Sequence, residues 1–454
     1  MKSYFKNVGL PMLFLTILMM FGCEKFLDEK TNATLAIPST AKDLQALMDT
    51  YYILNETDVS ADEVSAGDFY VTDTDFGTRT ETDQRLYTWQ NSNTLATRLN
   101  DWYYCYTIIY RTNSVIEGVD KVKPTNLTAE SLKNTKGQAH FFKAKAYLQA
   151  VNIWAKGYNK QTASTDLGVP IRKEADFNAP TVRATVEDNY QTIIADLKAA
   201  IDLLPNQQIH VMRPSKAAAN ALLARVYLWM GNYAEALKYS NDAMAIKKDL
   251  IDFNTLTASA IQPLAQFNTE VLMASRMVNL PIIAPSRAKV LPELYNSYEN
   301  NDLRKTVYFK GNADGSYAFK GSYDGTTLYF SGVATDEVYL TTAECNARLG
   351  NVDLALRDLN DLLRKRYRTG TYIDFTQRDP VLLLETIIKE RRKELLFRGL
   401  RWADIKRYNR DGAGISLTRT VAGKTYTLEA NSARFAIPIP EDIILLSGIP
   451  QNSY

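Results

Sequence analysis

The sequence predicts an all-α protein in which helical hairpins stack and two irregular segments are inserted. The first observation is a hairpin pattern over residues 217–248, where two runs with helical periodicity meet at Gly231. The second is a copy of that pattern around Gly350. The third is a change of character over residues 252–335, where prolines and turn pairs replace helical periodicity. Because one hairpin cannot bury its apolar face alone, repeated copies predict a stacked helical scaffold.

The hairpin at residues 217–248 shows the pattern most clearly. Gly231 followed by asparagine suits the tight reversal between two packed helices. Ala224 and Ala236 fall where the two helices must approach closely, and alanines occupy the same places around Gly350. This alternation of small and large residues around a Gly-x-Tyr turn is similar to a tetratricopeptide repeat.

Helical periodicity also marks the other segments of the scaffold. We expect a first helix over residues 39–51, repeat hairpins at about 101–158, 185–248, 336–367 and 380–409, and loop-rich insertions at about 55–100 and 252–335. Short strands are expected in the second insertion, where the turn pair Asp314-Gly315 precedes an aromatic run at Tyr317. The chain is expected to form one domain from residue 23 to residue 454.

The start of the chain has the features of a lipoprotein signal peptide. Lys2 and Lys6 precede an apolar run over residues 8–21, and Gly22 and Cys23 follow it. The run is too short for a membrane-spanning helix. We therefore expect residues 1–22 to be removed and Cys23 to carry lipid. The alternative is an ordinary signal peptide with an incidental cysteine.

Charge and cysteine usage exclude some classes of function. The chain has 53 Lys and Arg against 51 Asp and Glu, and removal of residues 1–22 takes two lysines, so the mature chain is neutral. A nucleic-acid binder would show a basic excess, and none is present. Cys105 and Cys345 lie in apolar helical patterns, where a small buried side chain is favoured over a disulfide.

No pattern of catalytic or metal-binding residues stands out. The chain has two histidines and lacks the spacings of serine hydrolases, zinc proteases and redox cysteines. Asp73-Thr-Asp75-Phe-Gly77 begins like a calcium loop, but Gln84 occupies the twelfth position and the glycine comes one place early. We interpret this segment as a solvated turn. The sequence therefore predicts a protein without catalytic residues, cofactor or metal.

Aromatic residues are the strongest indication of a ligand. The 27 tyrosines suit a protein that binds sugars, because sugar rings stack on flat aromatic side chains. Tryptophans in helical patterns, such as Trp102, are expected in the core, whereas aromatics in the insertions are candidates for ligand contact. The candidates are Tyr70, Trp89, Tyr295, Tyr298, Tyr317 and Tyr323. We expect the two insertions to converge into one ligand site. Alanine at Tyr70 or Tyr323 is expected to weaken binding while lowering the melting temperature by only a few degrees.

A late stretch, IIKERRKELLFRGLRWADIKRYN at residues 387–409, carries a family resemblance. It follows the lipobox cysteine, an early helix from Trp102 to Asn113, Gly168-Val169-Pro170 and the repeat hairpins, in that order. This order resembles the SusD/RagB family of nutrient-binding outer-membrane lipoproteins of Bacteroidetes. Arg398 departs from the family, which usually has an acidic residue there. Within the stretch, Glu390 with Lys393 and Glu394 with Arg398 have the spacing of ion pairs on a solvated helix face.

The resemblance implies a binding role at the outside of the outer membrane. A lipid-anchored protein of this kind binds oligosaccharide and delivers it to a SusC-like TonB-dependent transporter, and a RagB-like role with oligopeptides is the alternative. A glycoside hydrolase with two carboxylates across a cleft and a pure protein-interaction scaffold are less favoured. The repeat hairpins at Gly231 and Gly350 are expected to dock the transporter.

Overall fold

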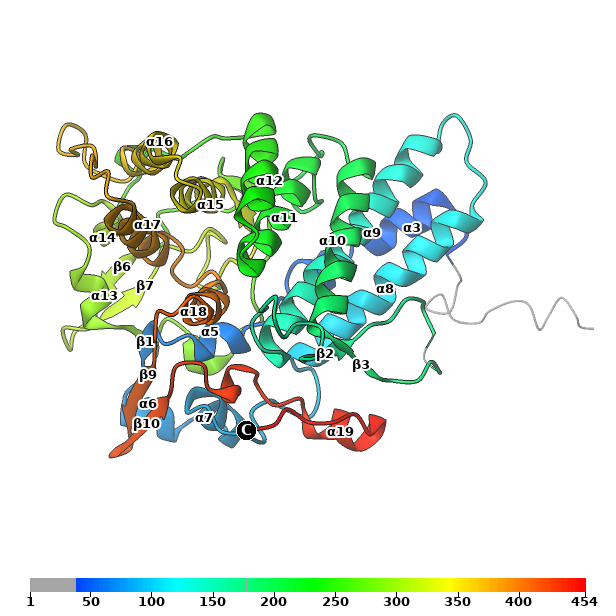
Figure 1. Ribbon diagram of the computed structural model, residues 1–454, viewed down its shortest axis with the longest axis horizontal. Helices are drawn as coiled ribbons and strands as arrows, with labels where there is room; N and C mark the ends of the chain where they lie inside the picture. The colour runs from blue at the N-terminus through cyan, green and yellow to red at the C-terminus, as the bar shows by residue number, and fades with distance from the viewer. Residues whose placement is uncertain (1–37, 177) are drawn as a thin grey trace, which may run out of the picture. The chain divides into compact units, whose positions relative to one another are not determined.

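A stack of helices runs through the computed structural model, which describes residues 38–176 and 178–454 (Figure 1). Residues 41–454 form one compact unit. Each helix of the stack packs against the next one along the chain, and α17 packs against α15. The helices are α8 (Asp101–Lys121), α9 (Ala129–Trp154), α10 (Val186–Leu203), α11 (Lys216–Met230), α12 (Tyr233–Ile246), α15 (Thr335–Arg348), α16 (Val352–Leu363) and α17 (Pro380–Glu394). The predicted all-α fold class is confirmed.

The two hairpin turns have the same geometry, as their sequences predict. Gly231 and Gly350 adopt φ of 78° and 80°, a left-handed conformation that costs a residue with a β-carbon more than it costs glycine. In the first turn the amide of Asn232 donates to the carbonyl of Tyr227 at 2.9 Å. Asn351 makes the equivalent bond in the second turn at 2.8 Å. These bonds satisfy carbonyls at the ends of α11 and α15.

The late helical segment differs from the prediction. A repeat hairpin was expected over residues 380–409, but α17, which ends at Glu394, packs against α15, and α18 (Arg401–Arg410) begins seven residues later. Phe397 at φ 57° and Gly399 at φ 69° reverse the backbone between them, which interrupts the helix. Consequently α18 packs against α5 (Ala61–Ser65) and α11.

The first insertion contains more helix than predicted. Besides α3 (Ala41–Met48), which packs against α8 and α9, this region forms short helices. They are α4 (Tyr51–Leu54), α5, α6 (Asp73–Gly77) and α7 (Glu81–Tyr87). The segment that resembles a calcium loop is α6, and the Thr72 hydroxyl caps it by accepting from the Asp75 amide.

Strands occur as five antiparallel pairs in the described part of the chain. They are β1 (Phe69–Tyr70) with β5 (Lys289–Val290), β2 (Leu167–Pro170) with β3 (Arg183–Thr185), β4 (Val271–Met273) with β8 (Val333–Ala334), β6 (Phe309–Gly311) with β7 (Tyr317–Phe319), and β9 (Leu417–Val421) with β10 (Lys424–Leu428). The β6–β7 hairpin was expected from its turn pair, whereas β9–β10 was not predicted.

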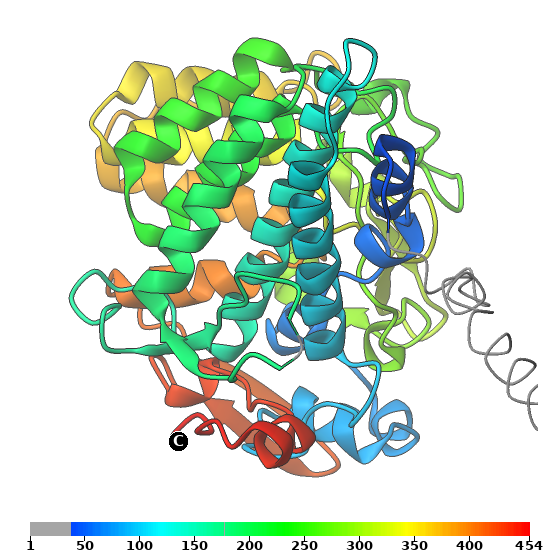
Figure 2. The ribbon, with the colours of Figure 1, turned by 90° about the vertical axis from the view of Figure 1, so that its right-hand side faces the viewer.

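Residues near the end of the sequence hold the end of α9. The Arg183 guanidinium donates to the carbonyl of Pro450 at 3.0 Å and to the side chain of Asn452 at 2.9 Å. The Asn452 amide in turn donates to the Trp154 carbonyl at 3.0 Å. The helix before this segment, α19 (Glu441–Ser447), lies below α8 in Figure 2.

Core predictions for the cysteines and tryptophans are confirmed. Cys105 and Cys345 are buried free thiols. Trp102, Trp154 and Trp402 are at most 5% exposed. Among residues 38–176 and 178–454, no helix has both the length and the apolar character needed to cross a membrane. Cys23 and residues 1–22 lie outside the described residues.

Candidate functional site

The two insertions lie side by side, as their shared aromatic content predicted. Strand β1 from the first insertion pairs with β5 from the second, so that Tyr70 faces Lys289 in the register. A parallel bridge between Asp58 and Met277 adds a second connection. The backbone therefore joins two segments that are separated by most of the repeat stack. Their convergence is confirmed.

A pair of stacked tyrosines lies at this junction. Tyr295 comes from α13 (Pro292–Asn296) and Tyr317 from β7, and both are half-buried. Their ring centroids are 3.5 Å apart and their planes differ by 13°. Phe309 meets Tyr295 edge-on at 5.3 Å, and the Lys305 ammonium lies 5.2 Å from the Tyr295 ring centre. We call Tyr295 and Tyr317 the tyrosine pair.

Polar groups surround the tyrosine pair. The Lys289 ammonium lies 2.9 Å from the Asp314 carboxylate and donates to the Ser316 hydroxyl at 3.1 Å, which ties β5 to the β6–β7 turn. The hydrogen bonds from Ser316 and Lys289 lower the pKa of Asp314. Burial, together with the Tyr317 hydroxyl, raises the pKa of Tyr295 to about 12. At neutral pH Tyr295 therefore presents a neutral hydroxyl, and Lys305 and the Lys289–Asp314 ion pair supply charges at the junction.

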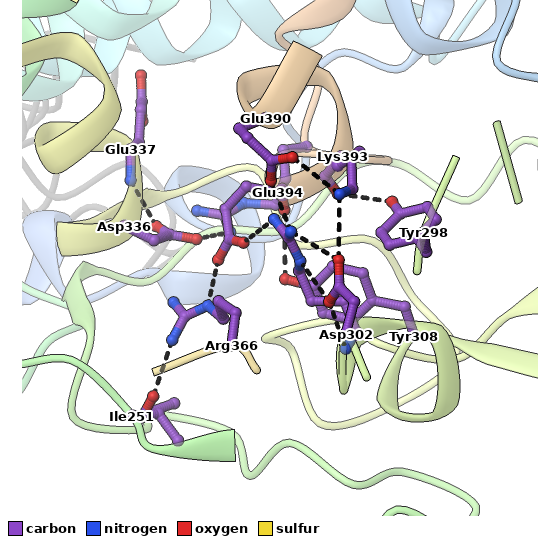
Figure 3. A network of polar contacts seen from close by, with 12 residues as sticks. Ile251, Tyr298, Asp302, Tyr308, Asp336, Glu337, Arg366, Glu390, Lys393 and Glu394 are labelled. Atoms are coloured by element: carbon purple, nitrogen blue, oxygen red, sulfur yellow. Dashed lines mark hydrogen bonds and ion pairs between the residues drawn. The ribbon is translucent and has the colours of Figure 1, made fainter. Parts of the chain in front are cut away.

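A network of buried charges fixes the elements beneath the tyrosine pair (Figure 3). Arg304, at the start of α14 (Arg304–Val307), contacts Asp302 at 2.7 Å, Glu390 at 2.6 Å and Glu394 at 3.0 Å. Further members of this buried charge network are Glu270, Arg366 and Lys393.

The network joins α17 to the second insertion. Arg366 contacts Glu394 at 2.7 Å and Glu270 at 2.8 Å. The Tyr298 hydroxyl donates to the Lys393 carbonyl at 2.8 Å. Burial raises the pKa of Glu270, and Arg366 opposes that shift. Because buried ions need several partners, the network holds α14 and the segment around Tyr298 in one position relative to α17.

The prediction of solvated ion pairs in the late stretch is wrong. Glu390 and Lys393 do pair, at 2.8 Å, but both side chains are buried. Glu394 contacts Arg304 and Arg366 instead of Arg398. The partners come from other parts of the chain, and helix spacing alone does not reveal them.

Arg398, which departs from the family pattern, is buried between one carboxylate and two aromatic rings. Its guanidinium donates to Asp336 at 3.1 Å. It lies 4.6 Å from the ring centre of Tyr323 and 4.5 Å from that of Phe330. Two aromatic faces and one carboxylate thus stabilise a buried cation.

The six aromatic candidates divide into two groups. Tyr70, Tyr295 and Tyr317 are half-buried at the junction of the insertions, and their contact with ligand stays a prediction. Trp89, Tyr298 and Tyr323 are at most 4% exposed. Their burial argues against the ligand contact that was predicted for these three.

Each buried candidate has internal partners. The Trp89 indole donates to the Ser65 carbonyl at 3.1 Å, and Tyr298 belongs with the charge network. The Tyr323 hydroxyl donates to Glu270, and its ring covers Arg398. Alanine at Tyr323 is consequently expected to destabilise the fold, contrary to the prediction of a small effect. Loop segments in this protein are packed into the core, which their irregular sequence does not reveal.

In the described residues, no group of three or more His, Cys, Asp or Glu side chains is arranged to hold a metal ion. At the junction the tyrosine rings can stack on a ligand, and Lys289, Asp314 and the tyrosine hydroxyls can make hydrogen bonds to it.

Both halves of the chain match known protein families. Residues 25–228 match a SusD-like family described as "Starch-binding associating with outer membrane", and residues 292–439 match the SusD family. The chain belongs to the SusD family. The second match includes α13, α17, α18 and the β6–β7 hairpin, so SusD-family sequence covers the tyrosine pair and most of the charge network.

One relative matches part of the chain in sequence, and solved structures agree with it in fold. SusD-like protein P2 of Formosa agariphila is 31% identical over 135 residues, which are 30% of this chain and 25% of that protein. The match therefore spans a quarter of the relative's length. A SusD superfamily protein from Bacteroides thetaiotaomicron has 21% identity and a TM-score of 0.73, covering 91% of this chain and 100% of its own. Surface glycan-binding protein A from Bacteroides uniformis has 18% identity and a TM-score of 0.70, covering 91% and 99%.

Lys289 and Lys305 were not among the predicted site residues. Lys305 lies 5.2 Å from the Tyr295 ring centre, and Lys289 contacts Asp314 and Ser316 in the turn before Tyr317, because the fold brings these distant segments together. A lysine in a loop-rich segment carries no sequence signal of its own, so the structure was needed to find these two.

Proposed function

We propose that this SusD-family protein is a lipid-anchored lipoprotein of the outer membrane that faces the cell exterior and binds oligosaccharide for nutrient uptake. The observation that carries the proposal is the tyrosine pair at the junction of the two insertions. Stacked rings offer an apolar face to the C–H side of a sugar, and Lys289 and Asp314 offer hydrogen bonds to its hydroxyls. Family membership and the surface glycan-binding protein of similar fold support the same ligand class.

The rigid support beneath the pair favours binding without a large entropic cost. Strand β7 and α13 rest on Phe309 and Tyr298, and Tyr298 is held by α17 through Lys393. Groups that are already ordered lose little freedom when a ligand arrives. We infer that the buried charge network serves this positioning.

A glycan array beside a peptide digest tests the ligand class. The mature chain, residues 24–454, contains the whole compact unit and is suitable for both. We expect Tyr317→Ala to weaken oligosaccharide binding roughly tenfold, because one stacking face is lost. Tyr426→Ala is the matched control, since Tyr426 is also a half-buried tyrosine on a two-stranded hairpin, beneath Lys424. Binding of peptides and of no glycan would replace the proposal by oligopeptide uptake.

Delivery to a SusC-like TonB-dependent transporter completes the proposal. The α11–α12 and α15–α16 hairpins present Lys238 and Asp353 at the surface, away from the tyrosine pair in sequence. We propose that this face docks the transporter. Charge reversal at Lys238 and Asp353 should weaken co-purification with the transporter and leave affinity for soluble ligand unchanged. Loss of ligand affinity in the folded variant would contradict this division of roles.

A further inference from the structure

A cleft lies between α8, the segment after β2 and α19. Its volume is about 330 Å³, within the range of ligand pockets. The walls include Tyr106 and Tyr110 on α8, Arg172 and Glu174 after β2, and Ile443 and Leu446 on α19. In Figure 1 these elements lie on the right, whereas α13, β6 and β7 lie on the left. The cleft is thus separate from the tyrosine pair.

One wall of the cleft is a row of aromatic side chains. Trp102, Tyr106 and Tyr110 follow one another at four-residue spacing along α8, which separates them by about 6 Å each. Trp102 stacks on Tyr106 at 4.7 Å, and the Tyr106 hydroxyl donates to the Pro170 carbonyl at 2.8 Å. These contacts fix Tyr106, while Tyr110 is 37% exposed. Tyr106 and Tyr110 therefore present their rings to the cleft, and the buried Trp102 supports Tyr106 from the core.

The polar rim is held in place by α8 and α9. The Asn113 side chain donates to the carbonyls of Arg172 at 2.9 Å and Glu174 at 3.2 Å. The Tyr147 hydroxyl accepts from the Arg172 amide at 2.7 Å. These bonds fix the backbone at Arg172 and Glu174, and the Arg172 guanidinium is held by the Ala179 carbonyl and the Thr181 hydroxyl, to which it donates. The exposed Glu174 side chain borders the rings.

The third wall has exposed apolar side chains. Leu446 lines the cleft and is 81% exposed, and its neighbour Leu445 is 85% exposed but does not line it. Exposed leucine next to ordered tyrosine gives an apolar strip between polar edges. Such a strip suits a ligand with flat C–H faces and hydroxyl edges.

We propose that this cleft is a second binding site for neutral oligosaccharide, and the inference rests on the proposed function. Tyr106 and Tyr110 stack against sugar rings, Glu174 accepts hydrogen bonds from hydroxyls, and Arg172 donates to them. Leu446 covers the opposite face of the sugar. A chain long enough to reach both sites would be held at two places, which raises its overall affinity through effective concentration.

The test is calorimetric titration with maltohexaose, cellohexaose, xylohexaose and mannohexaose. For a hexasaccharide that binds, we expect two sites per chain. Tyr110→Ala should weaken one site roughly tenfold and leave the other unchanged. Leu446→Ser should act in the same way. Tyr103→Ala, on the same helix and 48% exposed, and Leu445→Ser are matched controls that should keep both sites.

The outcomes separate this inference from the proposed function. A single site that Tyr317→Ala abolishes and Tyr110→Ala leaves intact would overturn the second site alone. A single site that only Tyr110→Ala weakens would overturn the role of the tyrosine pair and uphold the cleft. If none of the four sugars binds, both ideas fail. A peptide that binds at the cleft and is lost in Tyr110→Ala would refute the sugar assignment.

Discussion

Replacing Glu394 with glutamine should remove the charge that joins two buried arginines. Its carboxylate accepts from Arg366 Nε at 2.7 Å and from Arg304 Nη1 at 3.0 Å, and all three side chains are fully buried. Each charge-assisted hydrogen bond contributes about 1.5–3 kcal/mol. Glutamine keeps one acceptor oxygen but turns an NH₂ group toward a donor. We therefore expect the free energy of unfolding to fall by about 3–5 kcal/mol, as for other broken buried pairs.

Urea unfolding followed by circular dichroism measures this change. Asp353→Asn is the control, because Asp353 and its partner Arg378 are 78% and 62% exposed and such exposed pairs contribute little to stability. Should Glu394→Gln cost no more than the control, the buried charge network would not be the support assigned to it. The slope of the free energy of unfolding against urea concentration must be the same in both variants for their stabilities to be compared.

Three further outcomes are expected. Burial and the nearby Asp101 raise the pKa of Asp62 to about 8. The folded state therefore keeps a proton that the unfolded chain loses above its pKa near 4. The free energy of unfolding should fall by roughly 1–4 kcal/mol from pH 5 to pH 8, and by less in Asp62→Asn. If stability fell equally with pH in the wild type and in Asp62→Asn, Asp62 would not be the group responsible. Gly168→Ala should destabilise by about 1–3 kcal/mol in thermal unfolding, because its β-carbon would lie 1.9 Å from the Asn189 side-chain oxygen, whereas Gly77→Ala meets no atom within 4 Å and serves as control. Cys23→Ala should leave the membrane fraction on a salt wash, and retention would argue against a lipid anchor.

The repeat helices could be predicted because their signals are local. The apolar period of α11 and α12 and the glycine at Gly231 lie within one stretch of sequence, and so does the backbone hydrogen bond from Asn232 to Tyr227 that closes the turn. The same holds for Gly350. The sequence therefore predicted the helical fold class and both hairpin turns.

The candidate site could be predicted only in part, since its contacts are distant in sequence. Arg304 reaches Glu394 across 90 residues, and Arg392 reaches Asp68 across 324 residues. Helix spacing therefore suggested the wrong partners for Glu394. Aromatic content indicated the insertions correctly, but burial of Trp89 and Tyr323 depends on neighbours that only the fold brings together.

The hydrogen bond between Asn452 and the Trp154 carbonyl joins residues 298 positions apart. A ribosome makes about 5–20 residues per second, so the partner of Trp154 is made on the order of tens of seconds after α9. During that interval the Arg183 guanidinium has the carbonyls of Trp154, Leu167 and Gly168 as acceptors, but not Pro450 or Asn452. The first half of the protein therefore completes its hydrogen bonds at the end of α9 only after residues 450–452 have been made.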